Sequence, residues 1–199
     1  MKKISISPGN SKMGFIPSVS LPPVVTCAPG CKCAAKCYAA KLCRIRPSVK
    51  NAYNRNFEIL ITDPAAYWRQ VRAAAACSKY FRFHVSGDIV DDLYLYDMVL
   101  TAYKLPDTKF LAFTKRYGLV NEYISSGHAI PANLKIIFSA WPDMPMDNPY
   151  NLPVANVIFK YEKPADHWKI CGGNCMECAC RGVGCWELKS GENIAFYEH

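Results

Sequence analysis

Eleven cysteines in 199 residues limit the folds open to this chain more than any other feature. Ten of them fall into two groups near opposite ends of the sequence, and the eleventh, Cys77, stands in an alanine-rich segment. The start of the chain, MKKISISPGN, lacks the apolar stretch of a secretory signal, so we do not expect a disulfide scaffold. Such dense groups instead predict metal binding. We interpret Cys77 as a buried thiol of the core.

The first group has the spacing Cys27-x3-Cys31-x-Cys33-x3-Cys37, with Cys43 a short way beyond it. Zinc draws four sulfur atoms to about 2.3 Å from one ion, and two C-x2-C pairs usually supply them. Thiols at intervals of three, one and three residues suit the wider sulfur separations around an iron–sulfur cubane. Spacing alone leaves zinc and an iron–sulfur cluster as comparable interpretations.

The second group lies near the other end of the chain, and only Cys175-x2-Cys178 within it has the form typical of zinc. Nearby glycines give the loop the backbone freedom to wrap around a cofactor. We expect one cysteine, Cys180, to be a spare or alternate ligand. The four expected ligands are Cys171, Cys175, Cys178 and Cys185.

Strand-like and helix-like patterns alternate through the middle of the chain. Pro47 opens one helical stretch, Asp63 and Pro64 start a second, and YFRFHVSGD is typical of a strand that meets a tight turn at Gly87. Further strands are predicted at KFLAFT, LKIIFSAW and VANVIFKY, with helices between them. This order predicts an α/β fold with a parallel sheet, either closed as a partial (βα) barrel or left open.

We expect a single domain over residues 1–199. Loops that follow the C-terminal ends of parallel strands form the functional rim of such folds. That rim would bring the first cysteine loop beside Gly87-Asp88, Lys115-Arg116 and Trp141. The expected parts are an extended strand segment over 1–26, a cysteine loop over 27–43, βα units over 44–165 and an irregular cysteine-rich tail over 166–199.

The chain has 24 lysines and arginines against 16 acidic residues, a formal charge of +8 at pH 7. This excess suggests an anionic partner, but the charges are scattered and no run of like charge exceeds two residues. We therefore expect no more than weak, salt-dependent binding to nucleic acid. No uncharged apolar stretch approaches about 18 residues, which argues against a membrane partner.

Several segments together resemble the gene product 88 family of phages and prophages. The resemblance covers nearly the whole chain, and HVSGD and CYA are its most specific parts. Membership implies a phage-encoded protein that acts in the cytoplasm of the host bacterium. The segments are NSKMGFIPSVSLP, CYA at Cys37, RPSVKNAYNRNFEIL, FRFHVSGD, FLAFTK, and the C-x3-C-x2-C spacing that ends in GCW at Trp186.

The chain also has a distant likeness to the radical S-adenosylmethionine enzymes. In those enzymes a cysteine loop follows the first barrel strand, and a glycine-rich motif ending in an acid holds the amino group of the cofactor. Residues 27–37 and Ser86-Gly87-Asp88 occupy the corresponding places here. The C-x3-C-x2-C signature is absent from the first loop, and four ligands there would leave no iron open for S-adenosylmethionine. Both resemblances favour iron–sulfur over zinc.

Residues on the expected rim complete the candidate site. Asp88 and His84 are candidate catalytic groups, for which a helix N-cap and a hydrogen-bonded core histidine are the ordinary alternatives. Ser86 and Gly87 would contact the cofactor, and Lys115 would bind a carboxylate or phosphate.

Two functional hypotheses follow. The first is an iron–sulfur protein with one or two [4Fe–4S] clusters that carries out redox or radical-type chemistry on a small molecule or macromolecule. The second is a binding module, stabilised by zinc or an inert cluster, that engages nucleic acid or a host protein. The first is the preferred hypothesis, with Cys27, Cys31, Cys33 and Cys37 holding the first cluster.

Overall fold

The computed structural model describes residues 2–159 and 161–198 and has one eight-stranded sheet with the order β1-β2-β3-β4-β5-β6-β8-β7. Neighbouring strands are parallel except for β1 and β2, which are antiparallel. The predicted α/β class and parallel sheet are confirmed. The strands are β1 Ile6–Ser7, β2 Ser18–Val19, β3 Tyr80–Phe83, β4 Lys109–Thr114, β5 Leu134–Ser139, β6 Val154–Ile158, β7 Lys169–Ile170 and β8 Asn193–Tyr197.

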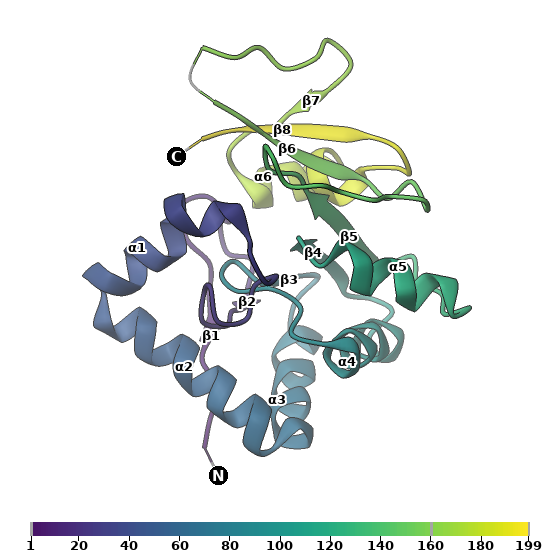
Figure 1. The fold of residues 1–199 in the computed structure, drawn as a ribbon. Helices are drawn as coiled ribbons and strands as arrows, with labels where there is room; N and C mark the ends of the chain where they lie inside the picture. Colours follow the sequence, from purple (N-terminus) through teal and green to yellow (C-terminus); the bar gives the residue numbers. More distant parts are fainter. Residues whose placement is uncertain (1, 160, 199) are drawn as a thin grey trace.

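The central parallel strands follow one another in sequence order across the sheet. Because crossovers between parallel strands are right-handed, this order places successive helices on the same face. Figure 1 shows α1 to α5 in an arc around the strands, with α6 beside β6 and β8. The helices are α1 Tyr38–Ile45, α2 Pro47–Thr62, α3 Pro64–Ala76, α4 Asp92–Lys104, α5 Tyr117–Ser125 and α6 Cys175–Cys180, with short 3-10 helices η1 Lys32–Lys36 and η2 Gly184–Glu187.

The two faces of the sheet are covered differently. Phe110 and Ala112 of β4 belong to the larger core, which the side chains of α2 to α5 complete. Leu111, between them, belongs to a second core with Trp186 and Leu188 of the C-terminal segment. Successive strand residues point to opposite faces, so burial of both faces explains the continuous apolar runs in β4 and β5.

The predicted helix starts are confirmed. Pro47 and Pro64 begin α2 and α3, where the missing amide hydrogen of proline needs no partner. Asp63 caps α3, since its carboxylate accepts a hydrogen bond of 2.9 Å from the Ala66 amide. Among the described residues, none of the helices combines the length and apolar character needed to cross a bilayer.

Four details of the sequence interpretation are wrong. The segment 1–26 contains only two strands of two residues each, and α1 already begins at Tyr38, inside the predicted loop 27–43. The tail over 166–199 is not irregular, because β8 is inserted between β6 and β7. Cys77 is exposed, not buried: it follows α3 as its C-cap, beyond the alanine-rich face that packs on the core.

Candidate metal centres

The first cysteine loop is shaped by the starts of two helices. Cys31 is the N-cap of η1, and Cys37 is the N-cap of α1. The Sγ atom of Cys37 accepts a hydrogen bond of 3.4 Å from the Ala40 amide. Free amide groups at a helix start stabilise negative charge, so these positions suit a thiolate.

The four predicted ligands Cys27, Cys31, Cys33 and Cys37 lie in one loop, and we call them the N-terminal thiol set. The Sγ atoms of Cys31 and Cys33 are 2.9 Å apart. Burial, and next the contact with Cys31, raises the pKa of Cys33 to about 12. Burial raises the pKa of Cys27 to about 11, with smaller effects of the same sign from Asp88, Cys37 and Cys31. The pKa values of Cys27 and Cys33 therefore respond to the charge of neighbouring thiols.

A second group forms where α6 meets η2. Burial is the main cause of the raised pKa of Cys185, and the charges of Cys171, Cys175 and Cys178 add to it. These four thiols, the C-terminal thiol set, are those predicted as ligands. Cys180, the expected spare, is exposed.

Backbone geometry also limits the residues around the second set. Gly184 has a φ of +70°, and a β-carbon there would lie 3.1 Å from the Sγ atom of Cys178. A side chain at this position would be strained and would press on that thiol. Gly184 thus keeps space beside the Cys178 sulfur.

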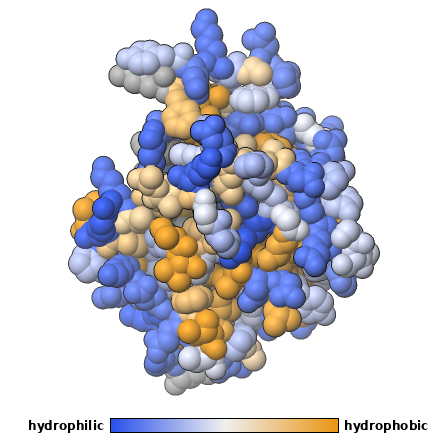
Figure 2. Space-filling view, in the orientation of Figure 1, coloured by the Kyte–Doolittle hydropathy of each residue, from blue (hydrophilic) through white to orange (hydrophobic). Residues whose placement is uncertain are grey.

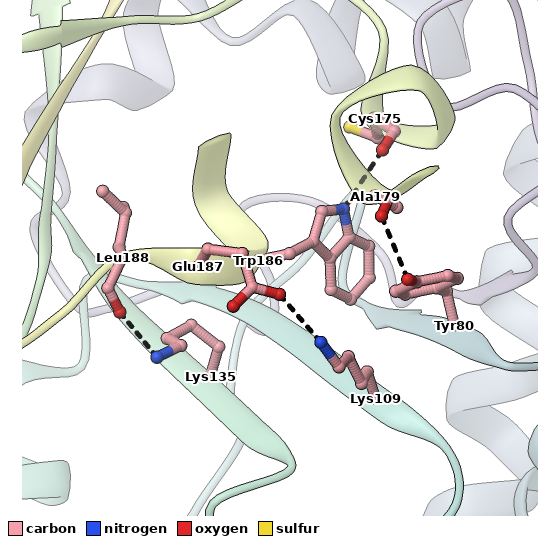
Figure 3. Close-up of polar contacts among 8 residues, drawn as sticks. All are labelled: Tyr80, Lys109, Lys135, Cys175, Ala179, Trp186, Glu187 and Leu188. Carbon is pink, nitrogen blue, oxygen red and sulfur yellow. Dashed lines mark hydrogen bonds and ion pairs between the residues drawn. The ribbon is translucent and has the colours of Figure 1, made fainter. Parts of the chain in front are cut away.

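Hydrogen bonds from the sheet hold α6 and η2 in place (Figure 3). The Tyr80 hydroxyl of β3 donates to the Ala179 carbonyl at 3.1 Å, and the Trp186 indole donates to the Cys175 carbonyl at 3.2 Å. The rings of Tyr80 and Trp186 pack edge to face, 5.0 Å between centroids. Two lysines of the sheet also contact this segment. The Lys109 ammonium pairs with the Glu187 carboxylate of η2 at 2.7 Å, and the Lys135 ammonium donates to the carbonyl of Leu188, the residue after η2, at 2.6 Å.

The N-terminal segment supports the same site, which the sequence did not reveal. The Cys175 amide donates to the Lys12 carbonyl at 2.8 Å, and Met13 is buried in the second core. A β-carbon on Gly14 would lie 2.5 Å from the Met176 β-carbon. The NSKMG sequence therefore packs against α6, and Gly14 allows the close approach.

Arg82 of β3 lies beside the C-terminal thiol set. Its Nη1 atom is 3.9 Å from the Cys175 Sγ atom, and its guanidinium lies 4.8 Å from the centre of the Phe113 ring. Burial raises the pKa of Tyr38, and the charge of Arg82 opposes that shift. The buried Nε atom has no hydrogen-bond partner within the described part of the chain. The sequence signal for this residue is a lone arginine that alternates with Phe81 and Phe83, and it was not recognised as part of a candidate site.

The SGD motif, Ser86-Gly87-Asp88, follows β3 and forms hydrogen bonds to residues near the ends of β2 and β4. The Ser86 hydroxyl donates to the Leu21 carbonyl at 3.0 Å. The Asp88 carboxylate is buried and accepts hydrogen bonds from the Thr114 hydroxyl at 2.6 Å and the Lys115 amide at 2.8 Å, besides one from the following amide. Burial raises the pKa of Asp88, and these hydrogen bonds oppose the shift. The N-cap of α4 is Asp91, so Asp88 does not cap that helix.

Lys115 projects toward the first thiol set. Its ammonium group donates to the Ser139 hydroxyl at 2.7 Å and lies 5.9 Å from the centre of the Trp141 ring. Its positive charge lowers the pKa of Cys33, against the larger effect of burial. The Tyr117 hydroxyl, at the start of α5, donates to the Ser139 carbonyl at the end of β5.

Comparison with known proteins agrees with this arrangement of motifs. Residues 2–185 match the family model described as gene product 88. The chain belongs to the gene product 88 family. The match spans both thiol sets and the SGD motif, and it confirms the first resemblance. No curated protein and no solved structure matches the chain, and none of the matches is to a radical S-adenosylmethionine enzyme.

His84 of this gene product 88 protein lies in the helix-side core. Its Nε2 atom is 2.8 Å from the Tyr94 hydroxyl, which is 3.2 Å from the Tyr67 hydroxyl. A φ of 58° at His84 turns the side chain toward these helices. Burial, helped by the charge of Arg82, lowers the pKa of His84 to about 3, so the imidazole is neutral near pH 7. Its position is that of a hydrogen-bonded core histidine.

The donor set of both sites consists of thiols. No three His, Cys, Asp or Glu side chains of residues 2–159 and 161–198 converge closely enough to hold one metal ion. All 11 cysteines are free of disulfides. An all-thiol donor set suits soft metals and iron–sulfur clusters, and the buried, unpartnered Nε atom of Arg82 offers a donor beside Cys175.

Proposed function

We propose that this gene product 88 protein is an iron–sulfur protein of phage origin with two [4Fe–4S] clusters. The N-terminal thiol set would hold one cluster and the C-terminal thiol set the other. The observation that carries the proposal is the clustering of eight free cysteines in two short segments, residues 27–37 and 171–185, with Arg82 3.9 Å from the Cys175 sulfur. A cluster bound by thiolates is anionic, so nearby cations stabilise it. We place the function in the host cytoplasm, where thiols remain reduced.

Electron transfer is the chemistry that such a pair of clusters would supply. Within the chain, Arg82 would hold positive charge beside the second set, and Tyr38 would shield the first set. The Tyr38 hydroxyl donates to the Val85 carbonyl, which fixes its ring beside Cys37. Tyr80 and Trp186 would exclude water from the second set, because their packed rings cover α6 from the sheet side.

The test is the metal content of protein purified without oxygen. We expect a brown protein with broad absorption near 400 nm and with iron and sulfide in equal amounts. Colourless protein with stoichiometric zinc would contradict the proposal and support the zinc-stabilised binding module. The Cys175-x2-Cys178 spacing is the sequence observation that favours that alternative.

Radical chemistry with S-adenosylmethionine is the more specific form of this proposal. The position of Asp88 near Cys27 and the sequential order of parallel strands support it. The hydrogen bonds of Asp88 to Thr114 and Lys115 give this carboxylate a positioning role in the described structure. A change in the EPR spectrum of the reduced protein on adding S-adenosylmethionine would favour the radical form, and an unchanged spectrum would leave electron transfer as the function.

Substitution of Arg82 tests its electrostatic role. We expect Arg82→Gln to lower the reduction potential of the C-terminal cluster by tens of millivolts, because the lost positive charge stabilised the more anionic reduced state. Arg82→Lys keeps the charge and should retain most of the potential. Potentials are measured by redox titration monitored by EPR, with iron content determined for both variants. Equal potentials in the wild-type protein and Arg82→Gln, at equal iron content, would contradict this role.

A further inference from the structure

The positive charge of this chain is concentrated at one end, although it forms no long run. Residues 1–62 contain ten lysines and arginines and a single acidic residue, Glu58. The rest of the chain contains 14 basic and 15 acidic residues. The whole excess of positive charge therefore belongs to the N-terminal segment, the first cysteine loop, α1 and α2.

The fold places most of these cations at the surface. We define the basic surface as six exposed cations of the N-terminal segment, of α1 and α2, and of the residue that joins these two helices. They are Lys3, Lys41, Arg44, Arg46, Lys50 and Arg55. None of the six forms an ion pair with another described residue. Glu58, the one acid, is paired with Lys2. In Figure 2 hydrophilic residues cover most of the left edge, where Figure 1 places α1 and α2.

Helical spacing aligns polar groups along α2. Arg46, Lys50 and Asn54 follow one another at intervals of four residues, as do Asn51 and Arg55, so each series lies along one side of the helix. From Arg46 to Arg55 the helix rises about 13 Å at 1.5 Å per residue. This length corresponds to about four phosphates at 3.4 Å per nucleotide of one strand.

A cleft opens between this side of α2 and the start of the chain. Its volume is about 610 Å³, and no apolar side chain of the described residues lines it. Amide groups beside cations can both donate to phosphate oxygens and accept from bases or sugar hydroxyls. The lining residues are Lys2, Lys3, Asn51, Asn54, Arg55 and Glu58.

We propose that the basic surface and its cleft bind the sugar–phosphate backbone of nucleic acid. The lining favours nucleic acid over an anionic membrane, since a membrane-binding helix needs a broad apolar face. The exposed large apolar residues of these two helices are separated from one another: Tyr38 starts α1, Ile45 ends it, and Ile61 lies near the end of α2. Binding uses side chains outside both thiol sets, so it does not depend on the metal that those sets hold.

The experiment measures binding of the purified full chain to fluorescein-labelled DNA, duplex and single-stranded, between about 50 and 200 mM salt. The variant Arg46→Gln/Lys50→Gln/Arg55→Gln should bind duplex about tenfold more weakly or worse, and the slope of log affinity against log salt should fall by about 2.7. The matched control, Lys79→Gln/Lys104→Gln/Lys163→Gln, removes the same charge from exposed positions elsewhere and should bind like the wild-type protein.

Three results would overturn the proposal. They are no binding to either DNA at the lowest salt, equal weakening by both triple variants, or binding to phosphatidylserine vesicles but not to DNA at the same salt. Circular dichroism and iron content confirm that each variant is folded. A cysteine variant that loses its iron but still binds DNA would show that DNA binding does not depend on the proposed clusters.

Discussion

Anaerobically prepared Cys175→Ser protein is expected to keep about half the iron and sulfide of the wild-type protein. Cys175 shares its site with Cys171, Cys178 and Cys185, and Arg82 contacts it at 3.9 Å. A serine oxygen is a harder donor than a thiolate and does not replace it well on iron–sulfur. The proposed N-terminal cluster would have its own ligands and should remain. Iron and sulfide per chain, together with the EPR spectrum of the reduced protein, measure the outcome.

Matched substitutions test which cysteines are ligands of which cluster. Cys180→Ser, in the same helix but exposed, should keep the full iron content. Cys27→Ser should lose the half that Cys175→Ser retains, and the two EPR spectra should differ. Full iron content in Cys175→Ser would show that Cys175 is not a ligand. Loss of all iron in either single variant would indicate one shared cluster in place of two.

Gly87→Ala is expected to lower the free energy of unfolding by about 2–4 kcal/mol. Gly87 has a φ of +78°, and a β-carbon there would lie 2.5 Å from the Thr26 hydroxyl and 2.8 Å from the Leu21 β-carbon. The Leu21 carbonyl would be only 2.9 Å away, so the backbone after β2 would have to move. Since Thr26 immediately precedes Cys27, the N-terminal cluster should also be lost more readily. Urea unfolding and iron content measure the two effects.

Gly127→Ala provides the control for backbone strain alone. Gly127 has a φ of +86°, but a β-carbon there would meet no atom within 4 Å. We expect a loss of about 1 kcal/mol and unchanged iron content. Equal destabilisation by the two substitutions would mean that the contacts with Leu21 and Thr26 contribute little. Gly87 would then be needed only for the positive φ of its turn.

Local signals predicted most of the fold. Proline and aspartate mark the starts of α2 and α3, and runs such as KFLAFT coincide with β4, because capping and burial act over a few residues. Strand β8 was missed because NIAFY follows a glycine-containing turn within a segment dominated by cysteines. Its place between β6 and β7 depends on pairing across the sheet, which no local pattern encodes.

The candidate sites were predictable to the extent that their ligands lie close in sequence. The spacing of cysteines identified both thiol sets, because short loops keep their members together. The contacts of Cys175 with the Lys12 carbonyl and with Arg82 join residues that are far apart in the chain, and only the fold reveals them. The role of Asp88 also came from the fold, since its partners Thr114 and Lys115 end another strand.

The position of β8 has a consequence for biosynthesis. Strand β7 pairs with β8 among the described residues, and the Cys171 amide donates to the Ala195 carbonyl of that strand at 2.9 Å. Ribosomes make β8 after every cysteine of the chain. The scaffold of the second thiol set is therefore complete only after β8, which follows every cysteine of the sequence, has been made and has paired with β7.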